Sequence, residues 1–476
     1  MYARALLSRS FFFLSLGLAS SLPSRAAEEV SPPVLPLSEV LKLAKDENQD
    51  VRVLLARAEE AKAQFTQALS IYMPHLFVDG SYTRNSVSGK FALPATFVVR
   101  DMGAPTGSPN HDPTKPDGPN NLEGNQTNYR AVEENFREIQ VQKLDQLQLK
   151  VSLTQTIFSA DQLIAVVSGN LGKNVAILQS RKGIQDLLFE VARAYLGIVQ
   201  LKEKARVQAE FVKDKKKHET DARLAFSVGS QPKIELLRAE IERSKAENDL
   251  ILATNALKIA TLGLGRLLNR TDPFEVEMPA EQPPEPQASN EDALAYRLDY
   301  RAALLGDRVA RQSRGLSFAK YVPSISAFGN YQIANNIGFT GRNDSFAGGL
   351  SFHFDIFDGL NREGLLREYY AQTHEAAAAV RSTQLRVLQD VDKAKVEIDN
   401  ARVSLQKANE QVRLAKENSR LVKVRYDAKA ATYLDLIDAD TTLKAAELAE
   451  VAATVDGILA GLQLQKAKGT FAQGLF

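Results

Sequence analysis

The chain has 476 residues, of which 59 are basic and 58 acidic, giving a formal net charge of +1, and it contains no cysteine. The lack of cysteine excludes disulfides, thiolate metal sites and a thiol nucleophile. The balanced charge argues against nucleic acid as a partner and predicts that most charged residues lie on solvated helix faces.

The first 26 residues have the pattern of a secretory signal peptide. Arg4 and Arg9 precede an apolar stretch at 11–22, and Ser24 and Ala26 provide the small residues of a cleavage site. The apolar stretch is too short to be expected as a membrane anchor. Because no run of 18 apolar residues follows it, we expect an exported mature chain without a transmembrane helix.

An internal duplication fills the mature chain. The segment 226–240, FSVGSQPKIELLRAE, recurs two hundred positions later as YDAKAATYLDLIDAD at 426–440. In both copies an aromatic residue precedes a small-residue turn and an apolar-acidic-apolar-apolar restart, a pattern that predicts the tip of a helical hairpin. Collinear matches upstream indicate that the first copy carries about 50 extra residues.

The first repeat is assigned to 27–272. Apolar spacings of three and four predict a helix from 37 to 71, and Pro74 follows it. Period-two alternation predicts strands at about 76–84 and 147–157, which close a hairpin. The intervening 90–138 is rich in Pro, Gly, Asn and Asp and is predicted as a long surface loop. Long helices are expected at about 159–226 and 233–268, and a Pro-rich linker at 273–289 ends the repeat.

The second repeat, 290–476, follows the same plan. A helix at 291–319 precedes strands at about 324–333 and 348–357, and long helices are expected at about 360–426 and 433–468. The first of these long helices carries an unbroken heptad of mostly apolar residues from Val387 to Tyr426, typical of coiled-coil packing along the whole helix.

The four strands alternate apolar and polar residues. Leu147, Leu149, Val151 and Leu153 lie on one face of their strand, and Gln148, Lys150, Ser152 and Thr154 lie on the other. Leu350, Phe352, Phe354 and Ile356 likewise alternate with His353 and Asp355. Four strands cannot close a barrel, and open edges are not tolerated in lipid, so several chains are expected to contribute to one barrel with the apolar rows facing lipid.

The chain resembles the TolC-like outer-membrane efflux protein family over essentially its whole mature length. The resemblance rests on the duplicated plan, on the junctions VSLTQTIF at 151–158 and LSFHFDIFDG at 350–359, and on the tips FSVG at 226–229 and TYLDLIDADTTL at 432–443. It implies an α+β membrane protein that forms a homotrimer, in which twelve strands make an outer-membrane barrel and twelve long helices make a periplasmic tunnel.

The same resemblance implies location and partners. We expect the protein in the outer membrane of a Gram-negative bacterium, with a large periplasmic portion, as the exit duct of a tripartite efflux or type I secretion system. The implied partners are outer-membrane lipid, a periplasmic adaptor (membrane fusion) protein and an inner-membrane pump of the RND, ABC or MFS type. No enzyme activity and no cofactor are implied.

Two carboxylates match an acidic pair that rings the periplasmic entrance in this family. They are Asp435 and Asp438, and their spacing of three places both on one helix face. Three copies would bring together about six carboxylates, which would favour cations. From the residues alone the alternative is that both acids sit early in a helix, where they suit the helix dipole.

Other tip residues also match the family. Tyr426 matches a tyrosine that helps to hold the tunnel shut, although a heptad core position accounts for it equally well. Val228 and Gly229 resemble the tip positions that touch the adaptor, and Gly229 alone is typical of a helix C-cap. The chain departs from the family pattern at Ala431, where an arginine tether is expected, and at Lys429, where a turn glycine is expected.

Two alternative functions come from other classes. A periplasmic coiled-coil adaptor or scaffold would never enter lipid and would need no Leu and Phe rows on its strands. A periplasmic hydrolase would need a catalytic constellation, and the five scattered histidines provide neither a catalytic nor a metal-binding one. The basic run at 213–217 is predicted as a solvated helix face rather than a binding patch.

Overall fold

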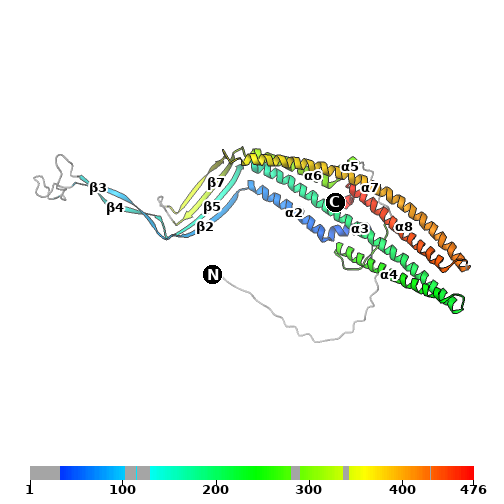
Figure 1. The fold of residues 1–476 in the computed structure, drawn as a ribbon. Coiled ribbons are helices and arrows are strands. Elements are labelled where there is room, and N and C mark those ends of the chain that lie inside the picture. The colour runs from blue at the N-terminus through cyan, green and yellow to red at the C-terminus, as the bar shows by residue number, and fades with distance from the viewer. Residues whose placement is uncertain are drawn as a thin grey trace, which may run out of the picture.

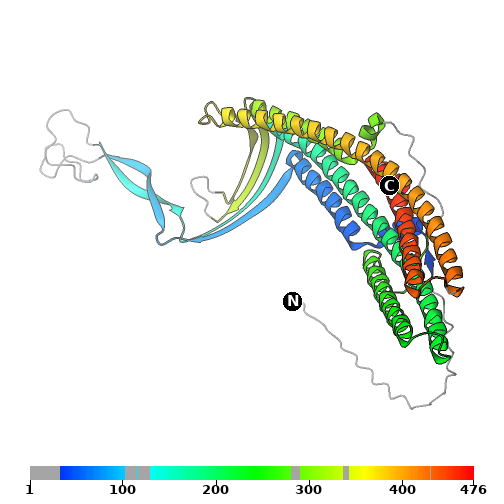
Figure 2. The same ribbon diagram turned by 45° about the vertical axis from the view of Figure 1, so that its right-hand side comes forward.

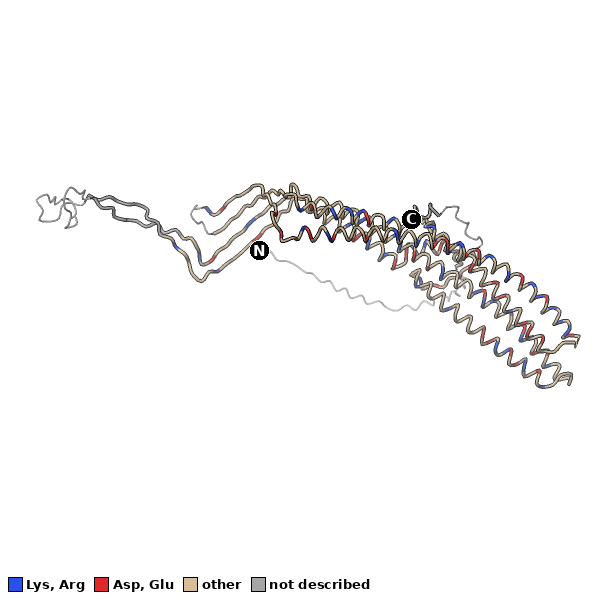
Figure 3. Tube along the Cα trace, turned by 45° about the horizontal axis from the view of Figure 1, so that its top comes forward, with Lys and Arg blue, Asp and Glu red and all other residues tan. Residues whose placement is uncertain are grey.

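The protein is an elongated molecule with a β-sheet towards one end and long helices extending to the other (Figure 1). The structure is a computed structural model that describes residues 33–101, 114, 129–279, 290–335, 342–428 and 430–475. The predicted signal peptide, most of the Pro-rich linker and Lys429 lie outside these ranges. Basic and acidic residues are interspersed along the helices (Figure 3).

The two repeats have the same order of elements. The first contains α1 (Leu37–Glu47), α2 (Gln49–Leu69), β2 (His75–Arg84), β5 (Asp145–Phe158), α3 (Ala160–Ser227) and α4 (Lys233–Leu267). The second contains α5 (Asn290–Tyr296), α6 (Leu298–Ala319), β7 (Ser324–Ala334), β8 (Asp344–His353), α7 (Asn361–Asp427) and α8 (Tyr433–Ala467). Helices α4 and α8 each have 35 residues and start two hundred positions apart.

The first repeat also contains a second β-hairpin, which the sequence analysis missed. Strand β3 (Gly89–Asp101) pairs antiparallel with β4 (Tyr129–Gln142), and this hairpin projects beyond the main sheet (Figure 2). The prediction of a surface loop over 90–138 is therefore wrong for its two flanks. The Pro, Gly, Asn and Asp residues cluster between the strands, whereas β-forming stretches such as ATFVV at 95–99 flank them.

The main sheet has the order β2-β5-β7-β8, and all its strand pairs are antiparallel. Its register gives the two faces different chemistry. One row across the four strands consists of Val78, Val151, Tyr331 and Phe346, and the next row, on the opposite face, consists of Asp79, Lys150, Gln332 and Ser345. Strands β2 and β8 are left as the two edges. Strand β8 ends at His353, so Phe354 and Ile356 lie past the strand that was predicted to contain them.

The long helices form a layer because their apolar seams meet. In the lower half, nearest the tips, α3 packs against α4 and α8, and α8 packs against α7, which leaves α4 and α7 at the edges (Figure 1). In the upper half, nearest the sheet, α3 packs against α2 and α6, and α6 packs against α7. The alternation of Val and Ala in the α7 seam lets α8 approach closely.

Lower and upper helices meet end to end at two joints. Asn48 caps α2 by accepting from the backbone N–H groups of Asp50 and Val51, and its Nδ2 donates to the Leu267 carbonyl at the end of α4, at 2.6 Å. At the other joint, Arg297 precedes α6 and donates to the Ala467 carbonyl at the end of α8, at 3.2 Å. Each joint thus satisfies a carbonyl that a helix terminus leaves without a partner.

Candidate functional site at the hairpin tips

The tip of the α3–α4 hairpin is shaped by a glycine. Gly229 has φ of +71°, its N–H donates to the Phe226 carbonyl, and the N–H of Ser230 donates to the Ala225 carbonyl. This pair of bonds is the Schellman arrangement that ends a helix, so the C-cap role of Gly229 is present. The turn also holds Val228 outward, with 69% of its surface exposed.

The second tip touches the first through Tyr426. Its hydroxyl accepts a hydrogen bond from Gln231 Nε2 at 3.2 Å, and its ring lies 6.2 Å from that of Tyr433. Both tyrosines belong to an apolar cluster that joins α3, α4, α7 and α8 near the tips. Burial raises the pKa of Tyr433 well above its ordinary value. Tyr426 therefore acts both as a core residue and as a contact between the two repeats of one chain.

Asp435 takes part in capping α8. Its Oδ2 accepts from the backbone N–H and the hydroxyl of Thr432, both at 2.8 Å, and the N–H of Asp435 donates to the Thr432 hydroxyl at 3.2 Å. These bonds form a capping box. The hydrogen bond from the backbone N–H of Thr432 is the main reason why the pKa of Asp435 lies below its ordinary value.

Asp438 lies one turn further along α8 and is exposed, as is Asp435. Among the described residues no hydrogen bond or ion pair is recorded for its carboxylate. The structure thus gives Asp435 the helix-start role that the sequence allowed as an alternative, and it leaves the Asp438 carboxylate free in the single chain. A ring of carboxylates needs further copies of the chain and remains a prediction.

A buried charged cluster two to three turns above the tips was missed. Lys215 is 1% exposed, and its Nζ lies 3.0 Å from Asp440 Oδ2. Ser419 donates to Asp440 Oδ1 at 3.2 Å, and His218 Nε2 lies 3.5 Å from Oδ2. The prediction of a solvated face over 213–217 is therefore wrong for Lys215. Its position three residues after Val212, in the α3 seam, is the signal that could have identified it.

The cluster continues through an aromatic ring on α3. The Nζ atoms of Lys215 and Lys444 lie 4.7 and 4.4 Å from the centroid of the Phe211 ring, within cation–π range. Lys444 also pairs with Asp249 of α4 at 3.3 Å. We name this group the bridging cluster, because it connects the α3–α4 hairpin to the α7–α8 hairpin; its members are Phe211, Lys215, His218, Asp249, Asp440 and Lys444.

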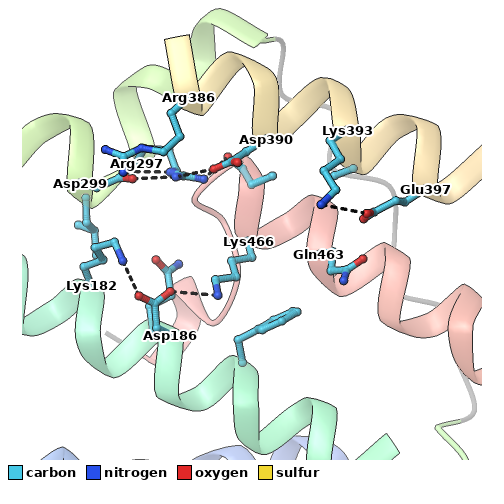
Figure 4. Close-up of a pocket in the computed structure, with 15 residues that line it drawn as sticks. Lys182, Asp186, Arg297, Asp299, Arg386, Asp390, Lys393, Glu397, Gln463 and Lys466 are labelled. Atoms are coloured by element: carbon cyan, nitrogen blue, oxygen red, sulfur yellow. Dashed lines mark hydrogen bonds and ion pairs between the residues drawn. The ribbon is translucent and has the colours of Figure 1, made fainter. Parts of the chain in front are cut away.

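A charged cavity of about 430 Å³ lies at the α8–α6 joint (Figure 4). Arg297 Nη2 pairs with Asp299 at 2.7 Å and with Asp390 at 3.0 Å, and Lys466 pairs with Asp186 at 3.0 Å. Burial alone would raise the pKa of Asp299, but hydrogen bonds from Arg297 outweigh it and hold that pKa below its ordinary value. Because its carboxylates are paired with bases, the cavity has the chemistry of a structural joint rather than of a reaction site.

Within the described ranges, no three His, Asp or Glu side chains gather as a possible metal site.

The structure places the predicted tip residues in three ways. Tyr426 contacts the first tip, Asp435 and Asp438 lie on one helix, and Val228 stands apart at the exposed turn.

Comparisons with known proteins agree with this architecture. The family model described as "Outer membrane efflux protein" matches residues 40–270 and 290–470. Outer membrane protein TolC of Vibrio cholerae is 24% identical over 352 residues, which cover 69% of this chain and 78% of TolC. Among solved structures, the outer membrane protein VceC of Vibrio cholerae has a TM-score of 0.69 at 18% identity, covering 91% of this chain and 96% of VceC.

The Campylobacter jejuni CmeC outer membrane channel has a TM-score of 0.71 at 16% identity, with 91% of this chain and 86% of CmeC covered. These likenesses show that the fold is that of the TolC-like channels, with a helical tunnel and a β-barrel region. The chain belongs to the outer membrane efflux protein family, whose members reside in the outer membrane with a large periplasmic tunnel.

Proposed function

We propose that this outer-membrane efflux channel works as a homotrimer and is the exit duct of a tripartite efflux or type I secretion system. In this role it receives substrates from a periplasmic adaptor protein and an inner-membrane pump of the RND, ABC or MFS type. The observation that carries the proposal is the combination of a two-faced sheet with two open edges and a helical layer with two exposed apolar edges.

The sheet supports a shared barrel. Each chain has four strands in the main sheet, with apolar and polar rows on opposite faces and unpaired edges at β2 and β8. Unpaired backbone groups are not tolerated in lipid, and the smallest membrane barrels have about eight strands. Three copies joined edge to edge give about twelve strands, enough to close a barrel around the polar face.

Helix α7 supports contact with another chain from Leu385 to Val424. Its seam residues, such as Val391 and Val412, are buried against neighbouring helices, yet the opposite side carries exposed apolar residues that recur at spacings of 11, 7 and 3. This spacing follows the period of 3.6 residues per turn, so the side chains form one straight stripe. The α7 stripe consists of Leu385, Val396, Val403, Leu414, Leu421 and Val424.

Helix α4, at the other edge of the layer, carries a matching α4 stripe. Its exposed residues are Ile234, Leu237, Ile241, Ile251, Leu252, Ile259 and Leu262. Among the described helices, α4 alone is long and apolar enough to cross a membrane, which was not expected from the sequence. Only 17% of its 18-residue apolar segment is buried in the single chain. Two different stripes on opposite edges suit a head-to-tail ring, in which α4 of one chain covers α7 of the next.

The tips supply the periplasmic end of the duct. Val228 and Gly229 form an exposed turn suited to contact with an adaptor, and Asp435 and Asp438 would lie around the entrance of the ring. Tyr426 would hold the two hairpins of each chain together at that entrance. The departures from the family pattern at Ala431 and Lys429 indicate that this chain uses other contacts to stay closed.

Two measurements test the proposal. Purified protein is expected to migrate as a trimer in detergent and to give ion conductance in planar lipid bilayers. A stable monomer without conductance would contradict the duct. Cell fractionation without detergent separates the duct from the scaffold alternative, because a periplasmic scaffold would be recovered in the soluble fraction and an outer-membrane channel with the membranes.

A further inference from the structure

A groove of about 730 Å³ lies at the end of α4, where the chain turns towards the short strand β6 (Glu275–Val276). The groove is lined by the last turns of α4 and by the residues that follow the helix, up to Phe274. Asp272 is the one acid of this lining. We name the feature the basic groove, after its three cationic lining residues, Lys258, Arg266 and Arg270.

The cations of the basic groove have no acidic partner in the part of the chain that the structure describes. None is recorded for Lys258, Arg266 or Arg270. The neighbouring acid Glu275 is not available to them, because it pairs with Lys202 at 2.9 Å. The groove therefore presents a surplus of positive charge.

The end of α4 does not need these cations as caps. Basic side chains near a helix C-terminus can bond its last carbonyls. Here the Gly265 carbonyl accepts from the backbone N–H groups of Leu268 and Arg270, and the Leu267 carbonyl accepts from the side chain of Asn48. The guanidinium groups of the basic groove are thus left for an anion that enters it.

The duplicated joint shows how the equivalent cation is neutralised in the second repeat. Lys466 of α8 stands two hundred positions after Arg266, and it pairs with Asp186 at 3.0 Å. Among the described residues, Arg266 lacks the carboxylate that its counterpart has.

The chain enters the described structure beside this groove. The carbonyl of Pro33 accepts from the N–H of Glu275 at 3.0 Å, and β1 (Val34–Leu35) pairs with β6 in parallel, with Val34 opposite Glu275. In a parallel pair both strands run in the same direction, so the residues before Pro33 are directed along the residues before Phe274, which line the groove. Pro32 and Pro33 also favour an extended backbone over a tight return.

The segment before Pro33 carries the complementary charge. Cleavage of the predicted signal peptide after residue 26 leaves AEEVSP at 27–32, which contains Glu28 and Glu29 and no basic side chain. Continuing the β1–β6 register places position 29 opposite Arg270. At about 3.3 Å per extended residue, Glu29 lies within about 13 Å of Pro33. Because so short a tether gives a high effective concentration at the groove, weak exposed ion pairs are sufficient to hold the segment there.

We propose that residues 27–32 of the exported chain dock in the basic groove, with Glu28 and Glu29 against Arg266 and Arg270. The segment becomes free to dock when the signal peptide is removed. Once docked, it continues β1 past the end of α4 and fastens the start of the chain to that helix. The site lies within one chain, so it does not depend on the proposed trimer.

The cysteine-free chain allows a proximity test on the mature protein in detergent. The continued register places position 30 opposite Thr271, so Val30→Cys with Thr271→Cys introduces two thiols and leaves all the proposed ion pairs in place. Disulfide formation with copper phenanthroline is followed over time by the loss of maleimide labelling. Val30→Cys with Thr254→Cys is the control, because Thr254 lies about 20 Å before the end of α4 and beyond the reach of the segment.

The thiol pair is then combined with changes of charge. The segment variant is Glu28→Gln with Glu29→Gln, and the groove variant is Arg266→Gln with Arg270→Gln. Each is expected to slow disulfide formation at least threefold, and the two together are expected to slow it no more than either alone. Reversing the segment with Glu28→Lys and Glu29→Lys should also slow it, and adding Arg266→Glu and Arg270→Glu should restore the rate, which shows that the variants are folded.

Two results would overturn the inference. Equal rates in all charge backgrounds would leave the basic groove to an anion from another molecule, and slowing by the segment variant alone would place the segment elsewhere. Mass spectrometry of the mature protein adds an independent check, since a chain that starts after Glu29 would lack the docking residues. The crosslink is intramolecular, so these readouts stay separate from the trimer and conductance measurements that test the duct.

Discussion

The ammonium group of Lys215 on α3 lies 3.0 Å from the carboxylate of Asp440 on α8, although 225 positions separate the two residues. Both side chains are largely or fully buried, and the pair joins the two repeats of the chain. Its geometry leads to two predictions, one on stability and one on pH.

Replacement of one partner is expected to destabilise the protein strongly. Lys215→Met leaves the Asp440 carboxylate buried without its cation, and losing one member of such a pair typically costs about 3–5 kcal/mol. The double variant Lys215→Met with Asp440→Leu removes both charges and is expected to recover most of this loss. Thermal unfolding in detergent measures both effects, and the two single variants and the double variant form a double-mutant cycle.

Lys216→Met provides the matched control. Lys216 is the next residue along α3, but it is exposed and pairs with Glu247 at 3.2 Å. Exposed pairs contribute about 0–1 kcal/mol, so this change is expected to be nearly silent. Equal losses for Lys215→Met and Lys216→Met would show that the bridging cluster does not stabilise the contact between the hairpins.

The same pair predicts a dependence on acid. Burial alone would raise the pKa of Asp440, but the hydrogen bond with His218 and the charge of Lys215 outweigh it and hold that pKa below its ordinary value. A lowered pKa in the folded state means that the carboxylate contributes stability above its unfolded pKa of about 3.9 and loses the contribution as the pH falls further. The difference in melting temperature between wild type and Asp440→Asn should therefore be largest near neutral pH and shrink below about pH 4. A difference that grew with acid would contradict the assigned sign.

Assembly of the ring is expected to depend on the α7 stripe. Val403 is 57% exposed in the single chain and lies in the middle of the stripe. Val403→Asp would place a charge in an apolar contact between chains, so trimers in detergent should give way to monomers. Thr254→Asp on α4 is the control, because Thr254 is also exposed but lies away from the α4 stripe. Trimers that survive Val403→Asp unchanged would remove the α7 stripe from the interface.

The features that could be predicted from the sequence are those that produce a short-range repeat of apolar residues. Alternation of apolar and polar residues predicted two different faces for the strands, and the row of Val78, Val151, Tyr331 and Phe346 confirms it. Apolar residues at spacings of three and four predicted the long helices. Strands β3 and β4 were missed because the turn-forming residues between them dominated the composition of the whole segment. Their pairing depends on contacts across about 40 residues, which no short period reveals.

The Lys215–Asp440 pair and the role of Asp438 could not be predicted from the sequence, because both depend on contacts between distant segments or between chains. Lys215 stands in a run of charged residues that is typical of a solvent-facing helix, and its partner Asp440 belongs to the other repeat. Helix α3 alone cannot indicate that a lysine is neutralised from α8. The role of Asp438 in turn depends on other copies of the chain, so neither the sequence nor the single-chain structure contains the contact that would define it.

The two acids near the start of α8 are expected to differ in effect, although both were assigned to one ring. Asp438→Asn should reduce cation selectivity and block by divalent cations in planar bilayers without changing thermal stability, because its carboxylate has no recorded partner among the described residues. Asp435→Asn should reduce selectivity and also weaken the capping box with Thr432.

Since hydrogen bonds from Thr432 lower the pKa of Asp435, Thr432→Val should make selectivity fall at a higher pH than in wild type. Glu450→Gln, further along α8, is the control for charge alone. If selectivity and divalent block were unchanged in the double variant Asp435→Asn with Asp438→Asn, these acids would not line the entrance.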